Sequence, residues 1–129
     1  MSDTLTPTNP AAAAATTAVQ RVTDALAALG HAHTPVMLDD AARTAQQAAD
    51  ALGVALGQIA KSIIFRRKGD DRSVLVVTSG DRRVDEKKVQ ALVCPEGTRL
   101  GRADADFVKA RTGFSIGGVS PLAHAEPPV

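Results

Sequence analysis

The stretch IAKSIIFRRKGDDRSVLVVTSGDRR, residues 59–83, constrains the fold more than any other part of the sequence. Two apolar runs flank a polar segment, KGDDR at 68–72, and this pattern predicts a β-hairpin. Because side chains alternate along a strand, Lys61 is expected on the same face as Ile63 and Phe65. A charged side chain on an apolar face marks either a sheet edge or a site.

The pattern outside the hairpin predicts helices and two further short strands. Helices are expected at about residues 19–29, 44–53, 85–94 and 104–111, from apolar spacing and from capping residues. The expected caps are Thr44 with Gln47, Asp85, Gly30, Gly53 and Gly113. Short strands are expected at 33–38 and in FSIGGVSP, 114–121. The hairpin run VLVVTS at 74–79 is almost continuously apolar, which favours a central strand covered on both faces.

These elements predict a single α+β (mixed α/β) domain over residues 17–129. Residues 1–16 are of low complexity and are expected to form a disordered tail. The chain has 129 residues, of which 44% are hydrophobic, and this length suits one domain. With three Phe and no Trp or Tyr, the core must consist of Val, Leu, Ile and Ala.

Composition excludes several classes of protein. A net charge of +1 gives no overall attraction to nucleic acid or to a membrane surface. One cysteine, Cys94, rules out an intrachain disulfide and fits a reducing compartment. No apolar run has the length of a membrane span, and the N-terminus lacks the pattern of a signal peptide. We therefore expect a cytoplasmic protein without a membrane partner, and the abundant Ala and Arg are typical of a GC-rich bacterial genome.

The position of Lys61 has two interpretations. A lysine at the C-terminal end of a helix, just before a strand, complements the helix dipole. Alternatively, Lys61 is a ligand for an anion or a carbonyl group at the mouth of a pocket. The local pattern leaves both interpretations open.

Two glycine-containing segments are candidates for ligand contacts. The paired Gly117 and Gly118 let the backbone approach a ligand and direct N–H groups toward an anion, or they form an ordinary tight turn. Gly80 follows a strand at a common ligand position, or it belongs to a strand-to-helix turn. The chain has no Walker lysine and no GxGxxG, so a nucleoside triphosphate site is not expected. It also lacks GxSxG, which argues against Ser120 as a hydrolase nucleophile.

Histidine, cysteine and basic residues give weaker indications. His31 and His33 form an HxH pair without a third ligand nearby, so we expect no metal and no other cofactor. His124 is expected to be solvated, and Cys94 to be a small buried residue. The basic clusters at 66–68, 82–83 and 87–88 are solvated faces or together follow a phosphate backbone.

Three segments carry a resemblance to a known family. GQIAKSIIF, VLVVTSGDRRVDEKKV and ADADFVKARTGFSIGGVSPLAH resemble the YbaK/ProX (EbsC-like) aminoacyl-tRNA deacylase family in order and spacing, over roughly residues 20–125. This resemblance implies an α+β domain around a mixed, largely antiparallel sheet with surrounding helices. Such a domain is similar to the editing domain of bacterial prolyl-tRNA synthetases.

The resemblance also implies an activity. Members of the family hydrolyse the ester between a wrong amino acid and its tRNA, acting in trans. Proline tRNA charged with cysteine or alanine is the leading substrate, prolyl-tRNA synthetase is a candidate partner, and DNA is not. An alternative of a different class is a non-catalytic module that binds aminoacyl-tRNA or its acceptor stem.

Several residues match the family's site. Lys61 matches an invariant lysine, which would anchor a phosphate of the terminal adenosine or polarise the ester. The N–H groups of Gly117 and Gly118 would stabilise an oxyanion. The residues matched to substrate binding are Ser62, Gly80, Ser120, Met37 and Leu38.

Family members continue beyond the position of Val129 through another strand and helices. We therefore expect the C-terminal part of the family fold to be missing from this chain. A missing strand would leave a sheet edge open to pairing.

Overall fold

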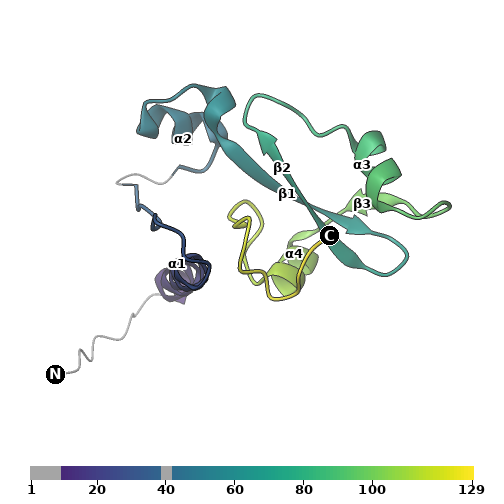
Figure 1. Ribbon diagram of the computed structural model, residues 1–129, viewed down its shortest axis with the longest axis horizontal. Coiled ribbons are helices and arrows are strands. Elements are labelled where there is room, and N and C mark those ends of the chain that lie inside the picture. Colours follow the sequence, from purple (N-terminus) through teal and green to yellow (C-terminus); the bar gives the residue numbers. More distant parts are fainter. Residues whose placement is uncertain (1–9, 39–41) are drawn as a thin grey trace. The chain divides into compact units, whose positions relative to one another are not determined.

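The structure is a computed structural model that describes residues 10–38 and 42–129 (Figure 1). The chain divides into two compact units, Met1–Val36 and Met37–Val129. The predicted domain boundary at residue 17 therefore lies inside the first unit. The predicted site residues all belong to the second unit.

The first unit contains one helix within its described residues, α1 (Pro10–Ala28). Proline is well tolerated in the first turn of a helix, and the alanines that follow are strong helix formers. The helix thus includes residues 10–16, which the sequence pattern assigned to a tail, whereas residues 1–9 lie outside the described part. After α1, Gly30 has a φ of 72° and a main-chain N–H that donates to Ala27, as expected of a helix end.

The strand predicted at 33–38 is not present, so this prediction was wrong. Residues 32–38 belong to no helix or strand, and Val36 is 79% exposed. An isolated apolar stretch becomes a strand only where another strand completes its hydrogen bonds.

The hairpin is present as predicted, and it organises the second unit. β1 (Ala60–Arg67) and β2 (Arg72–Ser79) pair antiparallel from Ala60 opposite Ser79 to Arg67 opposite Arg72. The short strand β3 (Leu100–Arg102) pairs antiparallel with the other side of β1, at Phe65–Arg67 only.

The strand order is β2–β1–β3, so β1 is central in this sheet and β2 lies at its edge. The prediction of a central strand at 74–79 was therefore wrong. Val74 is 1% exposed near the turn of the hairpin, but Val77 is 52% exposed toward its open end. A continuous apolar run gives no information about which of two neighbouring strands takes the middle position.

Helical segments follow the capping chemistry of the sequence. They are α2 (Ala45–Leu52), the 3-10 turn η1 (Leu56–Gln58), α3 (Glu86–Val93) and α4 (Ala105–Thr112). Thr44 and Gln47 form the predicted capping box, and the Asp85 side chain accepts from the Lys88 N–H. Gly53 and Gly113 end α2 and α4 in left-handed conformations, as predicted. None of the helices in the described part has the length and hydropathy that a membrane crossing requires.

The core lies where the hairpin meets α4. Val74, Val108 and Phe114 are at most 2% exposed, and α4 packs against β2. Thr112 is fully buried, and its hydroxyl donates to the Val108 carbonyl and accepts from the Phe114 N–H. This satisfied polar group fixes the direction in which the chain leaves α4.

The strand predicted within 114–121 is absent, because a turn takes its place. The Gly118 N–H donates to the Ser115 carbonyl at 2.9 Å, and Gly117 has a φ of 84°. A positive φ at the third position of a hydrogen-bonded turn favours glycine. The paired glycines therefore serve a turn at the start of the loop.

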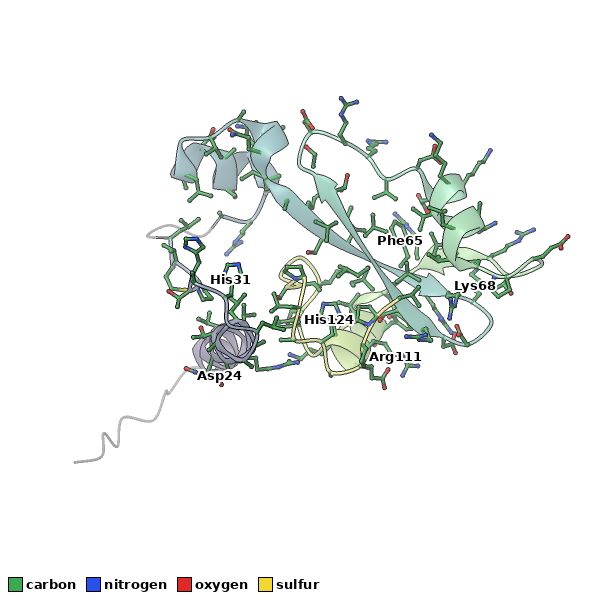
Figure 2. All side chains as sticks on the ribbon, viewed as in Figure 1. Asp24, His31, Phe65, Lys68, Arg111 and His124 are labelled. Atoms are coloured by element: carbon green, nitrogen blue, oxygen red, sulfur yellow. The ribbon has the colours of Figure 1, made fainter. Side chains whose placement is uncertain are left out.

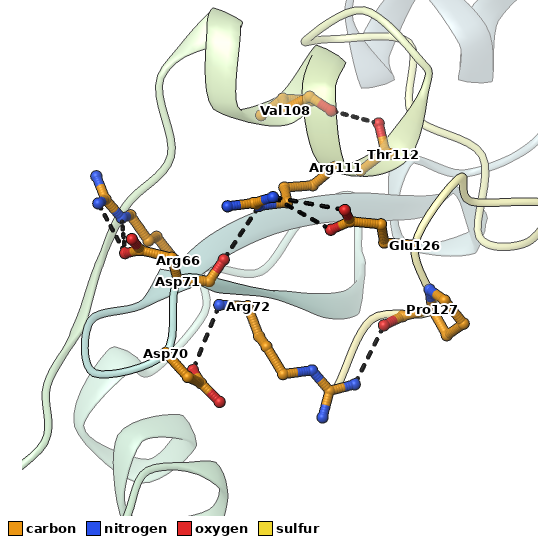
Figure 3. A network of polar contacts seen from close by, with 9 residues as sticks. All are labelled: Arg66, Asp70, Asp71, Arg72, Val108, Arg111, Thr112, Glu126 and Pro127. Carbon is orange, nitrogen blue, oxygen red and sulfur yellow. Dashed lines mark hydrogen bonds and ion pairs between the residues drawn. The ribbon is translucent and has the colours of Figure 1, made fainter.

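The C-terminal segment forms no helix or strand and is held by polar contacts (Figure 3). Arg111 donates to both carboxylate oxygens of Glu126 and to the Asp71 carbonyl, and Arg72 donates to the Pro127 carbonyl. Val129 donates to the Ser73 carbonyl at 2.9 Å and accepts from the Leu75 N–H at 3.1 Å. The outer edge of β2 therefore already holds one residue in a parallel pairing.

Together these elements form an α+β fold with an antiparallel sheet, which confirms the predicted fold class.

Candidate functional site

A cavity of about 1190 Å³ lies along β1. Its volume slightly exceeds the usual range for small-molecule pockets, about 300–1,000 Å³. Most lining residues come from α2 and the segment before it, β1, α4 with its N-cap, and the loop that follows α4, and β2, α3 and β3 add Val77, Glu86 and Arg102. All of them belong to the second unit.

The cavity runs along an open edge of β1 and also reaches over one face of the sheet to Val77 of β2. It is lined by the consecutive residues Ala60 to Phe65, whose side chains alternate between the two faces. A pocket over one face would contact every second residue. β3 pairs with β1 no further than Phe65, after which the chain turns into α4 at Asp104. The edge of β1 between residues 60 and 64 is thereby left unpaired among the described residues.

Lys61 lies in this cavity, half-buried, inside β1 and opposite Thr78. The register puts its side chain on the face of Ile63 and Phe65, as predicted. The preceding helical turn, η1, ends at Gln58, so Lys61 does not belong to a helix C-terminus. Within residues 10–38 and 42–129 its ammonium group has no hydrogen bond and no ion pair. A half-buried cation without a partner among the described residues is suited to an anionic or carbonyl ligand.

Other charged side chains line the same cavity. Arg43 precedes α2, Glu86 opens α3, and Arg102 lies opposite Phe65. Asp104 caps α4, since one of its carboxylate oxygens accepts from the Phe107 N–H at 2.8 Å. This mixture suits a zwitterionic or ester ligand better than a purely apolar one. Among the described residues no group of three His, Cys, Asp or Glu side chains is placed to hold a metal ion.

Of the two predicted catalytic glycines, Gly117 lines the cavity, with Val119 and Pro121 beside it. Gly118 does not line it, and its N–H is engaged with the Ser115 carbonyl. In this conformation the Gly118 N–H is therefore not free to bind an oxyanion.

The other end of the loop is held by His124 (Figure 2). Its Nε2 lies 2.6 Å from the Ser120 carbonyl oxygen, and its ring meets Phe114 edge-on, with the ring centroids 6.0 Å apart. The prediction that His124 is solvated was wrong, because the ring is half-buried under the loop. The Ser120 hydroxyl accepts from the Leu122 N–H and does not line the cavity.

The remaining predicted substrate residues differ in position. Ser62 lines the cavity next to Lys61. Met37, which is 71% exposed, and Leu38, which is half-buried, are not among the lining residues.

Gly80 is explained by packing. A Cβ atom there would lie 2.6 Å from the Leu56 carbonyl oxygen and 3.2 Å from the Ile59 Cβ. Gly80 lies outside the cavity lining, and its N–H donates to the Ile59 carbonyl at 2.7 Å. The absence of a side chain at Gly80 thus permits close contact between β2 and η1.

One of the basic clusters, at 66–68, is partly used by the fold itself. Arg66 pairs with Asp71 at 2.7 Å and lies over the Phe107 ring, 5.5 Å from its centroid. Arg67 pairs with Asp70 at 2.7 Å and donates to the Val93 carbonyl. The hydrogen bond from Arg67 lowers the pKa of Asp70 to about 2. These arginines stabilise the hairpin turn, whereas the basic residues at 82–83 and 87–88 are exposed.

Sequence reasoning did not single out Arg43, Glu86, Arg102 or Asp104 as lining residues. Local pattern carries no signal for Arg102, because its place depends on a pairing between β1 and β3 over a long sequence separation. Asp104 stands directly before a helix in the sequence. This position indicates a helix cap and gives no indication of contact with a cavity.

A model of the aminoacyl-tRNA editing domain matches residues 39–129 of this chain. The chain belongs to this YbaK-like family. The uncharacterized protein YwhH of Bacillus subtilis (strain 168) is 39% identical over 85 residues, which are 66% of this chain and 52% of YwhH. A proline--tRNA ligase of Caldicellulosiruptor bescii is 34% identical over 80 residues, which are 62% of this chain and 13% of the ligase.

The editing-domain fold is also seen in a solved structure. A crystal structure of a candidate trans-editing enzyme for prolyl-tRNA synthetase matches with a TM-score of 0.75 and 39% identity. The match covers 85% of this chain and 68% of that one. The chain thus spans about half of YwhH and about two thirds of this structural relative.

Proposed function

We propose that this chain is an aminoacyl-tRNA deacylase that edits in trans. The observation that carries the proposal is Lys61, an unpaired cation among the described residues, in a cavity along an open strand edge. The editing-domain match over residues 39–129 supports the same reaction class. The acceptor end of a mischarged tRNA, in the cytoplasm, would occupy the cavity.

The reaction requires few protein groups, because an aminoacyl ester is already reactive. A water oxygen attacks the ester carbonyl carbon, the bond to the ribose oxygen breaks, and that oxygen takes up a proton. Lys61 would anchor a phosphate of the terminal adenosine or polarise the carbonyl. Ser62, beside it in the cavity, would contact the substrate directly.

The loop after α4 would supply the wall opposite Lys61. Gly117 lies in the cavity lining, and its N–H would be a loop donor for an oxyanion. Gly118 would contribute only after the turn opens, and Ser120 would act through the shape of the loop. We retain Gly80 as a packing residue of the site, and Met37 and Leu38 as candidates for the amino-acid pocket.

We propose cysteine or alanine on proline tRNA as the substrate. A synthetase pocket shaped for proline discriminates poorly against small apolar residues, because one methylene is worth only about 1–3 kcal/mol. For a cysteinyl ester the substrate thiol can attack its own carbonyl carbon and form a thiolactone. The partner would then be prolyl-tRNA synthetase, which produces the error.

Proline tRNA charged separately with cysteine, alanine and proline tests this function. The proposal expects one mischarged species to be hydrolysed over many turnovers per site, with prolyl-tRNA spared. A non-catalytic module would retain the charged tRNA and release no amino acid. That outcome would replace the deacylase with a binding protein.

A further inference from the structure

The main chain of β1 faces its open edge at three residues that line the cavity. The Gly80 N–H donates to the Ile59 carbonyl at 2.7 Å, so the odd-numbered residues of β1 direct their main-chain groups toward β2. The Lys68 N–H donates to the Arg99 carbonyl at 2.9 Å on the other side, toward β3. Ala60 and Ser62 therefore direct their N–H and C=O groups toward the open edge, and Ile64 directs its N–H there, beyond the last residue that pairs with β3.

The outer edge of β2 shows how an open strand edge binds the main chain of a single residue. Val129 donates its N–H to the Ser73 carbonyl and accepts from the Leu75 N–H, at 2.9 and 3.1 Å. One residue is thus held alongside Val74 by its own amide nitrogen and carbonyl oxygen. The Ser62 carbonyl and the Ile64 N–H form the equivalent pair around Ile63, inside the cavity.

An aminoacyl ester has the same N–Cα–C=O unit as a residue in a chain. We propose that the Ser62 carbonyl binds the α-ammonium of the aminoacyl group and that the Ile64 N–H binds its ester carbonyl. The inference rests on the proposed function and specifies how that site recognises an amino acid. It uses atoms common to all amino acids, which leaves selection by side chain to the cavity walls.

The arrangement also supplies a donor for the reaction. When water attacks, the negative charge develops on the oxygen that the Ile64 N–H contacts. A main-chain N–H fixed in a central strand is pre-organised for this charge. It would act in place of the Gly118 N–H, which is engaged in a turn.

The first test compares two non-hydrolysable analogues of the charged 3′ end. In 3′-alanylamino-3′-deoxyadenosine the amino group is present, and in the 3′-propionylamino analogue it is missing. Both are amides, so neither is consumed during a titration. The inference predicts that the alanyl analogue binds about 10- to 100-fold more tightly, as expected for a charge-assisted hydrogen bond.

The second test follows individual amides by NMR. Binding of the alanyl analogue should shift the Ile64 amide resonance and slow its hydrogen exchange. The Ile63 amide is the internal control, because its N–H faces β2 and should change little. A paired N–H is protected with or without the ligand, whereas an open-edge N–H gains protection only on binding.

Equal affinity for the two analogues, or no saturable binding of either, would overturn the inference. An unchanged Ile64 amide, with shifts confined to the loop at 115–121, would overturn it as well. Deacylation of mischarged tRNA is measured separately. Continued turnover with an unchanged Ile64 amide would reject this binding mode and leave the proposed function standing.

Discussion

The Nε2 of His124 lies 2.6 Å from the carbonyl oxygen of Ser120 and ties the C-terminal segment to the loop at the cavity. A carbonyl only accepts, so the imidazole carries its proton on Nε2. Its Nδ1 is buried without a partner among the described residues. This hydrogen bond therefore links the C-terminal segment to the loop that contains Gly117.

Replacing His124 should therefore affect both stability and activity. His124→Leu removes the donor and should lower the free energy of unfolding by about 1 kcal/mol. His124→Gln retains an N–H at a similar reach and should recover most of the deacylation rate. Urea unfolding and kcat/KM on mischarged tRNA measure the two effects. Equal activity of the two variants would mean that the hydrogen bond does not position the loop.

Gly80 and Gly118 should respond differently to alanine. Gly80→Ala brings a Cβ to 2.6 Å from the Leu56 carbonyl oxygen. This overpacking should lower the free energy of unfolding by about 1–3 kcal/mol. At Gly118 the nearest atom is the Ser115 oxygen at 3.7 Å, an ordinary contact. Gly118→Ala should therefore stay within about 0.5 kcal/mol of the wild type in urea unfolding. Similar losses in the two variants would contradict the packing role of Gly80.

Gly117 and Gly97 form a matched pair for separating strain from function. Their φ angles are 84° and 83°, and at neither position would an added Cβ meet another atom within 4 Å. Substitution by alanine should lower the free energy of unfolding by about 1–2 kcal/mol at either position. Only Gly117 lines the large cavity, so only Gly117→Ala should lower kcat/KM, by roughly 10- to 100-fold. Equal loss of activity in both variants would assign the effect to stability alone.

The acid stability of the hairpin turn depends on Asp70. Its folded pKa of about 2 lies below the ordinary value of 3.8, because Arg67 donates a hydrogen bond to the carboxylate. The ionised form therefore stabilises the fold above pH 4, and this contribution is lost as the pH falls from about 4 to about 2. Asp70→Asn should reduce the slope of stability against pH in this window, as followed by urea unfolding. An unchanged slope would show that the pair adds nothing in solution.

Local chemistry in the sequence predicted much of the fold. The capping box at Thr44, the N-cap at Asp85 and the left-handed glycines at 53 and 113 are each decided by a few neighbouring residues. The hairpin register follows from one polar turn between two apolar runs. Such features depend on interactions within a few residues, and local sequence contains them.

The features that were not predicted depend on distant partners. Which hairpin strand is central depends on where β3 pairs, and the segments at 33–38 and 114–121 lack a partner strand. The site residues also divide into those that local sequence indicates and those that depend on distant partners. Local pattern singled out Lys61 and Gly117, and a resemblance assigned them and Ser62 to the site, whereas Arg102 enters the cavity through a long-range pairing.

The central claim is that Lys61 acts on the substrate and does not support the fold. Lys61→Met removes the charge and keeps the length of the stem, and Lys87→Met is the control at an exposed position outside the cavity lining. Both variants should match the wild type in urea unfolding. Single-turnover hydrolysis of mischarged proline tRNA should fall on the order of 100- to 1000-fold in Lys61→Met and stay unchanged in Lys87→Met. Wild-type rates in Lys61→Met would contradict the account.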